Sequence, residues 1–266
     1  MKKLLGFSIF LVFVLIASLT AEAKVTLPAI FSDNMVLQQN TQVNVWGKAA
    51  PGEKVTVKAS WLDKPVTAKA AANGKWTVKL KTPKATTNQS VTVSGENEIT
   101  INNVLIGEVW LCTGQSNMEF PVSRHPDVKW NTGMLNEAEE LKDADYPEIR
   151  LFHVKHQLAH EGELDDCEGE WLVCNPKNLY DFSAVGFVFG RKLYKELKMP
   201  VGLIQSTWGG THAESWTKLD VMKKNPLYAD VLKDFALEGV KQQKNYCKVP
   251  ATLWNGMIHP ILGYTI

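Results

Sequence analysis

Short stretches in which apolar and polar residues alternate dominate the chain from residue 24 to about residue 104. An alternation with a period of two is typical of strands that bury one face. Turn-forming sequences separate the stretches, as at 50–53 (APGE) and 72–75 (ANGK). The pattern predicts an all-β sandwich domain over residues 24–104, with strands at 42–47, 54–58, 75–80 and 89–93. We expect Trp46, Trp61 and Trp76 to fill its core, because aromatic side chains bury large apolar areas.

The pattern changes after residue 104. Residues 104–112 (VLIGEVWLC) are almost continuously apolar, which is typical of a strand buried on both faces of a parallel sheet. Further runs at 148–154 and 201–206 predict two more strands. Between them, a helix is predicted over 182–198, and its buried face is expected to carry the apolar residues spaced by four, which are Val185, Phe189, Leu193 and Leu197. Strand, helix and strand in this order predict an α/β domain over residues 105–266, and residues 216–248 are expected to be helical and surface-facing.

The first 23 residues have the pattern of a cleavable signal peptide. Lys2 and Lys3 precede an apolar stretch over 4–17, and Ala21-Glu22-Ala23 provides a small-x-small cleavage site. We expect cleavage after Ala23 and a secreted or periplasmic protein. No later stretch is long and apolar enough to predict a membrane span in the mature chain.

The charge is almost balanced, with 29 Lys and Arg against 28 Asp and Glu and a formal net charge of +1. A nucleic-acid-binding domain typically carries a basic patch, so we expect no nucleic-acid partner.

Four cysteines lie in the part that would be exported, namely Cys112, Cys167, Cys174 and Cys247. An oxidising compartment permits disulfides, and Cys167 and Cys174 are the candidate pair because they bracket a short segment. The spacing does not fix the connectivity. No Cys-x-x-Cys pair with a partner His-x-x-x-His is present, so a zinc site is not expected.

The strongest candidate for chemistry is the sequence 114–118 (GQSNM), where the predicted strand 104–112 ends. Functional groups of open α/β sheets gather at the carboxyl ends of the strands, so Ser116 is well placed as a nucleophile. The alternative is a turn that only connects strand to loop. The sequence is not the Gly-x-Ser-x-Gly elbow of α/β-hydrolases, because Met118 stands in place of the second glycine.

A second turn, Trp208-Gly209-Gly210-Thr211, follows the predicted strand at 201–206. Glycines let backbone amides approach a substrate closely, so either Gly209 or Gly210 could donate to an oxyanion that forms at Ser116. The alternative here is a simple glycine turn. Trp208 is a candidate for stacking on a sugar ring, although core packing is the default role of a tryptophan.

Several separate blocks, in the right order, resemble the sialate O-acetylesterases, a branch of the SGNH hydrolases. They are 27–38 (LPAIFSDNMVLQ), 114–120 (GQSNMEF), 182–186 (FSAVG), 201–204 with 208–211 (VGLI, WGGT) and 254–258 (WNGMI). The resemblance implies a flavodoxin-like parallel-sheet hydrolase domain after the β domain. It also implies a carbohydrate esterase that removes acetyl groups from sialic acid or other glycans and needs no metal or other cofactor.

By this resemblance, Ser116 matches the family's nucleophile, and Gly210, or alternatively Gly209, matches the glycine of the oxyanion hole. Gln115, Asn117 and Trp208 are the substrate-binding candidates. The serine would attack the acetyl carbonyl, a histidine would take and return the proton, and water would release acetate from the acyl-enzyme.

Two blocks of the family are not found in these 266 residues: the Gly-Glu-Ser-Asn-like turn and the Asp-x-x-His block that supplies the general base. We therefore expect a hydrolase domain that is incomplete at its C-terminal end and an enzyme that is severely impaired or inactive, since general acid–base help contributes about 10²–10⁴-fold. His212, next to the glycine turn, is the best local substitute for the base. Three other histidines, His153, His156 and His160, are expected to be exposed and polar, and His259 to be structural.

A different class of function remains open: a non-catalytic carbohydrate-binding or scaffold fragment. Sialate-type and xylan-type acetyl esters would need the same serine chemistry, so both substrates stay open as well.

Overall fold

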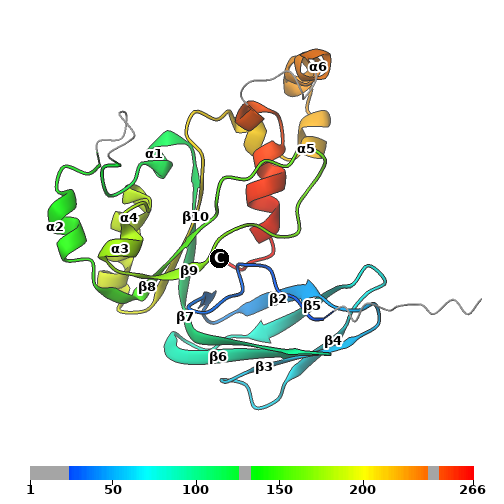
Figure 1. The fold of residues 1–266 in the computed structure, drawn as a ribbon, viewed down its shortest axis with the longest axis vertical. Helices are drawn as coiled ribbons and strands as arrows, with labels where there is room; N and C mark the ends of the chain where they lie inside the picture. Colours follow the sequence, from blue (N-terminus) through cyan, green and yellow to red (C-terminus); the bar gives the residue numbers. More distant parts are fainter. Residues whose placement is uncertain (1–23, 126–132, 239–245) are drawn as a thin grey trace, which may run out of the picture.

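The computed structural model describes residues 24–125, 133–238 and 246–266. The expected signal peptide lies outside these residues. The described chain is a mixed α/β structure with a large sheet, a smaller sheet and helices beside the large one (Figure 1). Its strands are β1 (Val36–Gln38), β2 (Gln42–Lys48), β3 (Lys54–Ala59), β4 (Val66–Lys69), β5 (Lys75–Lys81), β6 (Thr86–Ser94), β7 (Glu98–Gly114), β8 (Tyr146–His153), β9 (Trp171–Cys174) and β10 (Val201–Thr207).

Short helices predominate among the helical segments. The α-helices are α1 (Ser116–Glu119), α2 (Glu137–Lys142), α3 (Pro176–Leu179), α4 (Ala184–Leu197), α5 (Leu219–Lys223) and α6 (Ala229–Glu238). The 3₁₀ segments are η1 (Ala213–Trp216), η2 (Pro226–Tyr228), η4 (Tyr246–Lys248) and η6 (His259–Ile261), and η5 (Trp254–Ile258) is a π-helical turn. Within the described residues, no helix has the length and apolar character needed to cross a membrane.

The large sheet has the strand order β4-β3-β6-β7-β10-β8-β9, with β1 beside β7. The pairs from β4 to β7 are antiparallel, whereas β10 runs parallel to both β7 and β8. The parallel pairing expected after residue 104 is therefore present. Three strands were not predicted from the sequence: β1, β4 and β9. Each has only three or four residues, too few to show a period.

The strand β7 takes part in both regions of the sheet. Its first half pairs with β6, as in Val91 with Ile101, and its second half pairs with β10 from Glu108 to Gly114. Asn103, between the two halves, has a left-handed φ of 54°. One continuous strand of 17 residues thus leads from the antiparallel region to the turn that carries Ser116.

The strands β2 and β5 form a separate antiparallel sheet whose inward residues share a core with the large sheet. Trp76 is buried in this core, as expected, whereas Trp46 and Trp61 are only half-buried against it. The same core continues into the α/β region through Phe152 and Trp171. The first 80 described residues and the α/β region therefore share one hydrophobic core.

The helix α4 corrects one expectation. It packs on a second hydrophobic core, and the predicted buried face is wrong at three of its four positions: Val185, Phe189 and Leu197 are 40% or more exposed, whereas Leu193 packs against the core. The buried residues of α4 are Phe187 and three small ones, Ala184, Gly186 and Gly190. A Cβ atom at Gly190 would lie 2.6 Å from a methyl carbon of Leu203, so the helix backbone packs directly on β10. Glycines carry no hydrophobic signal, and the pattern of larger residues therefore indicated the opposite face.

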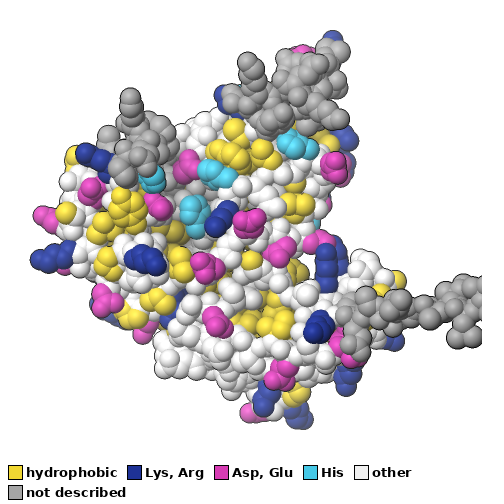
Figure 2. Space-filling view, viewed as in Figure 1, with side chains coloured by type: hydrophobic (Ala, Val, Ile, Leu, Met, Phe, Trp, Pro, Cys, Tyr) yellow, Lys and Arg dark blue, Asp and Glu magenta, His cyan; other side chains and the backbone are white. Residues whose placement is uncertain are grey.

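Charges of both signs are mixed on the molecular surface. The face shown in Figure 2 carries Lys and Arg (dark blue) and Asp and Glu (magenta) side by side, with no separate basic field. This distribution matches the almost balanced composition.

The candidate disulfide between Cys167 and Cys174 is wrong for this structure, in which both thiols are free. Cys167 belongs to the core shared with the β2 and β5 sheet, whereas Cys174 belongs to the core under α4. The two side chains thus point into different cores, which prevents the pairing that their short separation suggested. Burial raises the pKa of each thiol to about 12.

We expect all four cysteines to be found as free thiols. Protein denatured without reductant should take up four equivalents of iodoacetamide, whereas the native protein should react slowly, because only Cys247 is more than marginally exposed and the thiolate is the reactive form. Intact-mass spectrometry before and after alkylation measures this. Only two alkylated cysteines in the denatured protein would show that a disulfide forms.

Candidate active site

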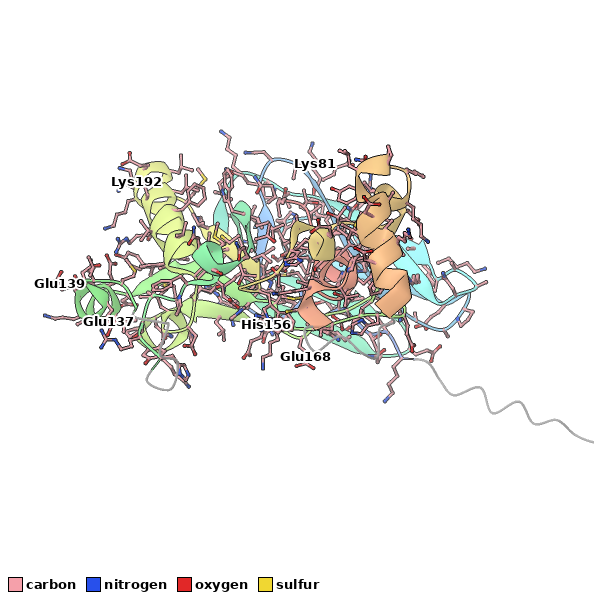
Figure 3. All side chains as sticks on the ribbon, turned by 90° about the horizontal axis from the view of Figure 1, so that it is seen from above. Lys81, Glu137, Glu139, His156, Glu168 and Lys192 are labelled. Atoms are coloured by element: carbon pink, nitrogen blue, oxygen red, sulfur yellow. The ribbon has the colours of Figure 1, made fainter. Side chains whose placement is uncertain are left out.

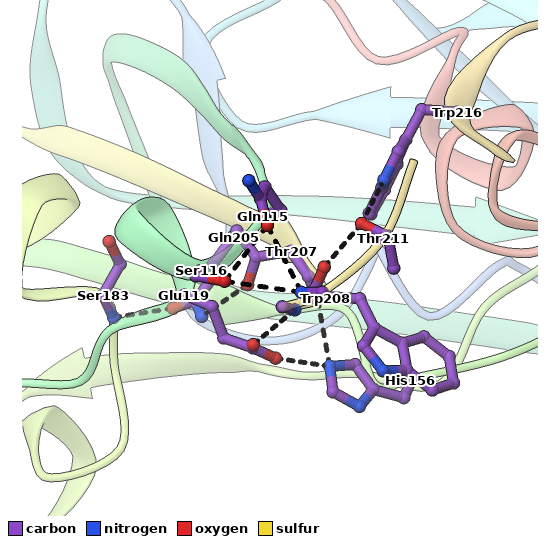
Figure 4. Close-up of polar contacts among 12 residues, drawn as sticks. Gln115, Ser116, Glu119, His156, Ser183, Gln205, Thr207, Trp208, Thr211 and Trp216 are labelled. Atoms are coloured by element: carbon purple, nitrogen blue, oxygen red, sulfur yellow. Dashed lines mark hydrogen bonds and ion pairs between the residues drawn. The ribbon is translucent and has the colours of Figure 1, made fainter. Parts of the chain in front are cut away.

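Ser116 lies at the start of α1, directly after the end of β7 (Figure 4). Its side chain is exposed, and its hydroxyl donates to Gln115 Oε1 at 3.1 Å. The backbone amide of Gly210 lies 3.4 Å from Ser116 Oγ and 3.3 Å from Gln115 Oε1. The structure thus brings together the two turns that were predicted separately, one after β7 and one after β10.

The two glycines of the second turn have different partners. The amide of Gly209 donates to Glu119 Oε2 at 2.5 Å, whereas the amide of Gly210 is shared between Gln115 Oε1 and Ser116 Oγ. Gly210 has a φ of +72°, in the left-handed region that favours glycine. Of the two alternatives left open by the sequence, the geometry favours Gly210 as an oxyanion donor.

Glu119 connects three segments of the chain. Besides Gly209, its carboxylate contacts His156 Nε2 at 2.7 Å, and His156 follows β8. Burial opposes ionisation of Glu119, but the hydrogen bonds from His156 and Gly209 outweigh it, and the pKa of this carboxyl lies below its usual range. Glu119 is therefore an anion at neutral pH, three residues after Ser116 on the same helical turn.

The histidines lie outside the hydrogen-bond contacts of Ser116. Across residues 24–125, 133–238 and 246–266, no histidine nitrogen is a hydrogen-bond partner of Ser116 Oγ. His212 stands at the N-cap position of η1, where its side chain makes no capping hydrogen bond. His156 is exposed, as expected, but it contacts Glu119 in the site. His153 was expected to be exposed and is instead half-buried. Its burial, together with the nearby His156, lowers the pKa of His153. His259 Nδ1 lies at hydrogen-bond distance, 2.8 Å, from the carbonyl oxygen of Leu164.

Three residues were candidates for substrate binding. Gln115 and Asn117 are exposed on either side of Ser116. The ring of Trp208 stacks on that of His156 with centroids 4.0 Å apart and an angle of 4° between the planes. One face of Trp208 is therefore covered by a side chain of the protein rather than open to a sugar.

Two cavities lie away from Ser116. One of about 580 Å³ is lined by Trp46, Trp76 and Asp165, among others, and one of about 430 Å³ by His153, Lys177 and Asp181, among others. Neither is lined by Ser116 or Gly210.

In the part of the chain that the structure describes, no group of three or more His, Cys, Asp or Glu side chains is arranged to hold a metal ion.

Sequence reasoning missed three residues that shape the site: Glu119, His156 and Gln205. The buried Gln205 accepts from the Ser183 amide at 2.7 Å and donates to Thr207 Oγ1 at 3.0 Å, which ties the end of β10 to the start of α4. Glu119 had a detectable signal, because it lies three residues after Ser116 in the 114–120 block. Seen from above, His156 lies near the middle of the molecule, far from Glu137 and Glu139 of α2 (Figure 3).

Comparisons with known proteins agree on one family. The family model described as "Carbohydrate esterase, sialic acid-specific acetylesterase" matches residues 106–256, more than half of the chain. The sialate O-acetylesterase of Mus musculus is 31% identical over 278 residues, which cover 90% of this chain and 50% of the mouse protein. The sialate O-acetylesterase of Homo sapiens is 31% identical over 256 residues, covering 88% of this chain and 46% of the human protein.

A solved structure gives the same answer. A carbohydrate acetylesterase from Xanthomonas citri superimposes with a TM-score of 0.75 at 29% sequence identity, covering 91% of this chain and 50% of that chain. The chain spans about half the length of the relatives it matches. The matched residues include both the Ser116 turn and the Gly210 turn. The chain belongs to the sialic acid-specific acetylesterase family of carbohydrate esterases.

Proposed function

We propose that this chain carries the nucleophile and an oxyanion donor of a secreted carbohydrate O-acetylesterase. The observation that supports this most directly is the 3.4 Å distance between Ser116 Oγ and the amide of Gly210. When Ser116 Oγ bonds to an acetyl carbon, the carbonyl oxygen lies one bond further on, within reach of this amide. Donors aimed at a developing oxyanion are usually the largest single contribution to acyl-transfer catalysis.

The reaction would proceed through an acetyl-enzyme. Ser116 Oγ loses its proton as it forms a bond to the acetyl carbon, and the electron pair of the carbonyl double bond moves to the carbonyl oxygen. The double bond then re-forms, the bond between the acetyl carbon and the sugar oxygen breaks, and the sugar oxygen takes up the proton. Water then attacks the acetyl-enzyme and releases acetate. The sugar would be an O-acetylated sialic acid or another acetylated glycan, in line with the names of the relatives.

Proton transfer limits this chemistry in the 266 residues. The serine hydroxyl donates to an amide oxygen of Gln115, which does not accept the proton as a base does. A general base typically contributes 10²–10⁴-fold, so we propose that hydrolysis by this chain is slow.

We also propose that residues 1–23 direct export and that residues 24–104 act as a β-sandwich on which the site is built.

The test is acetate release from three substrates: an O-acetylated sialic acid, acetylated xylan and p-nitrophenyl acetate. We expect release above the buffer blank, with an acetylated intermediate on the peptide that contains Ser116, found by mass spectrometry after acid quenching. The two sugar substrates discriminate the sialate-type from the xylan-type activity.

Binding of an acetylated glycan without any acetate release or acetyl adduct would overturn the esterase and support the non-catalytic carbohydrate-binding role. Hydrolysis without an adduct on that peptide would place the nucleophile elsewhere.

A further inference from the structure

The carboxylate of Glu119 is shared between two partners that come from different parts of the chain. Oε2 accepts from the Gly209 amide at 2.5 Å, across 90 residues, and Oε1 lies 2.7 Å from His156 Nε2, across 37 residues. The Glu119 side chain is only 18% exposed. Glu119 therefore fastens the nucleophile helix to the turn after β10 and to the segment after β8.

His156 acts as a hydrogen-bond donor in this arrangement. Its Nε2 faces two acceptors, Glu119 Oε1 at 2.7 Å and the carbonyl oxygen of Thr207 at 3.0 Å. A ring nitrogen between two acceptors must carry the proton. Nε2 is thus unable to take a proton from Ser116, and His156 acts on the site through its contacts with Glu119 and Thr207.

The turn after β10 is also restrained by packing at Trp208 and Gly209. The His156 ring stacks on Trp208, the residue between Thr207 and Gly209. At Gly209 there is no room for a side chain, because a Cβ atom would lie 2.6 Å from Glu119 Oε2 and 3.3 Å from Ser116 Oγ. These contacts restrain the turn residue by residue from 207 to 209, leaving the next amide, that of Gly210, to face the serine.

We infer that Glu119 and His156 are positioning residues, which hold the turn at 207–210 so that the Gly210 amide, and not the Gly209 amide, is presented to the oxyanion at Ser116. The effect on catalysis rests on the proposed function, whereas the restraint on the turn does not.

Amide hydrogen exchange tests the restraint without any need for activity. In the ¹⁵N-labelled protein, we expect the Gly209 amide to be protected and to exchange about tenfold faster or more in Glu119→Ala, since this variant removes its hydrogen bond to a charged group. His156→Phe keeps a ring to stack on Trp208 but removes the bond to Glu119, so we expect a smaller acceleration. Glu139→Ala, on the exposed side of α2 far from the site, is the matched control and should leave exchange unchanged.

Kinetics test the catalytic consequence. For hydrolysis of p-nitrophenyl acetate, we expect Glu119→Ala to lower kcat by up to about 10²-fold with little change in KM, because a misplaced oxyanion donor acts in the transition state. Glu119→Gln keeps an oxygen for Gly209 and should recover part of the loss. A purely structural role would instead lower the melting temperature without this split between kcat and KM.

The outcomes separate the two proposals. If Gly209 exchange responds to Glu119→Ala but the wild type hydrolyses nothing, the proposed function fails and the restraint stands. If the wild type is active and neither exchange nor kcat changes in Glu119→Ala, the positioning role is overturned. Should Glu119→Ala fail to fold, Glu119→Gln and His156→Phe decide in its place: unchanged exchange and kcat in both would overturn the inference.

Discussion

Replacement of Ser116 by alanine is expected to reduce acetyl-ester hydrolysis to the rate of the buffer blank and to abolish the acetyl adduct. Among the described residues, Ser116 carries the one side-chain hydroxyl that is hydrogen-bonded to the Gly210 amide, and the hydroxyl of the neighbouring Thr211 donates to the carbonyl oxygen of Trp208 instead. The Ser116 side chain is exposed and donates only to Gln115, and we therefore expect the free energy of unfolding to change by less than about 0.5 kcal/mol. Initial rates on p-nitrophenyl acetate and urea denaturation measure the two effects.

Ser94→Ala is the matched control, because it removes a partly exposed serine hydroxyl on β6, opposite Glu98 at the end of β7 that lies away from Ser116. Its rate should equal that of the wild type. An unchanged rate in Ser116→Ala would mean that the hydrolysis arises from other surface groups, and the proposed nucleophile would then be wrong.

The second large effect is on stability. Trp171→Ala is expected to lower the free energy of unfolding by about 3–5 kcal/mol, the usual cost of removing a large buried aromatic side chain. Trp171, on β9, is 1% exposed and packs on Phe152 with ring centroids 5.4 Å apart. Its indole nitrogen donates to the carbonyl oxygen of Ile30 at 2.8 Å, which joins the α/β region to the chain before β1. Urea denaturation followed by circular dichroism measures the loss.

Two further tryptophan variants divide this loss into its parts. Trp171→Phe keeps most of the apolar area but leaves the Ile30 carbonyl without its donor, so we expect a cost of about 1–3 kcal/mol. Trp110→Ala removes a side chain that is 41% exposed and should cost less than half as much as Trp171→Ala. Equal losses at positions 110 and 171 would contradict the assignment of Trp171 to the shared core.

The strands were the most predictable part of the fold, because their signal is local. The alternation at 42–47 and 75–80 and the apolar run at 201–206 correspond to β2, β5 and β10. The orientation of α4 was predicted wrongly because its packing depends on Gly190, whose contact with Leu203 has no counterpart in a hydrophobic pattern. The Cys167–Cys174 pair failed for a related reason: closeness along the chain does not show which core each side chain enters.

The candidate site was predictable only where the chain turns. Ser116 and the two glycines follow strands, and the parallel order of β7 and β10 brings those strand ends together. The contact of Glu119 with His156 depends on the path of the chain after β8, which no local pattern encodes. The choice between Gly209 and Gly210 as the oxyanion donor likewise depends on where Glu119 Oε2 lies, because this oxygen accepts from the Gly209 amide.

Because β7 is one continuous strand, the position of Ser116 depends on the register in which the first half of β7 pairs with β6. Side chains alternate along a strand, so a slip of one residue against β6 would exchange the two faces of everything that follows. Trp110 and Cys112, which both face α4, would then lie on the opposite face, and the turn at 114–116 would be displaced by one residue relative to Gly210. An insertion or deletion within 98–106 therefore has to be absorbed by a bulge before Glu108 if Ser116 is to keep its position beside Gly210.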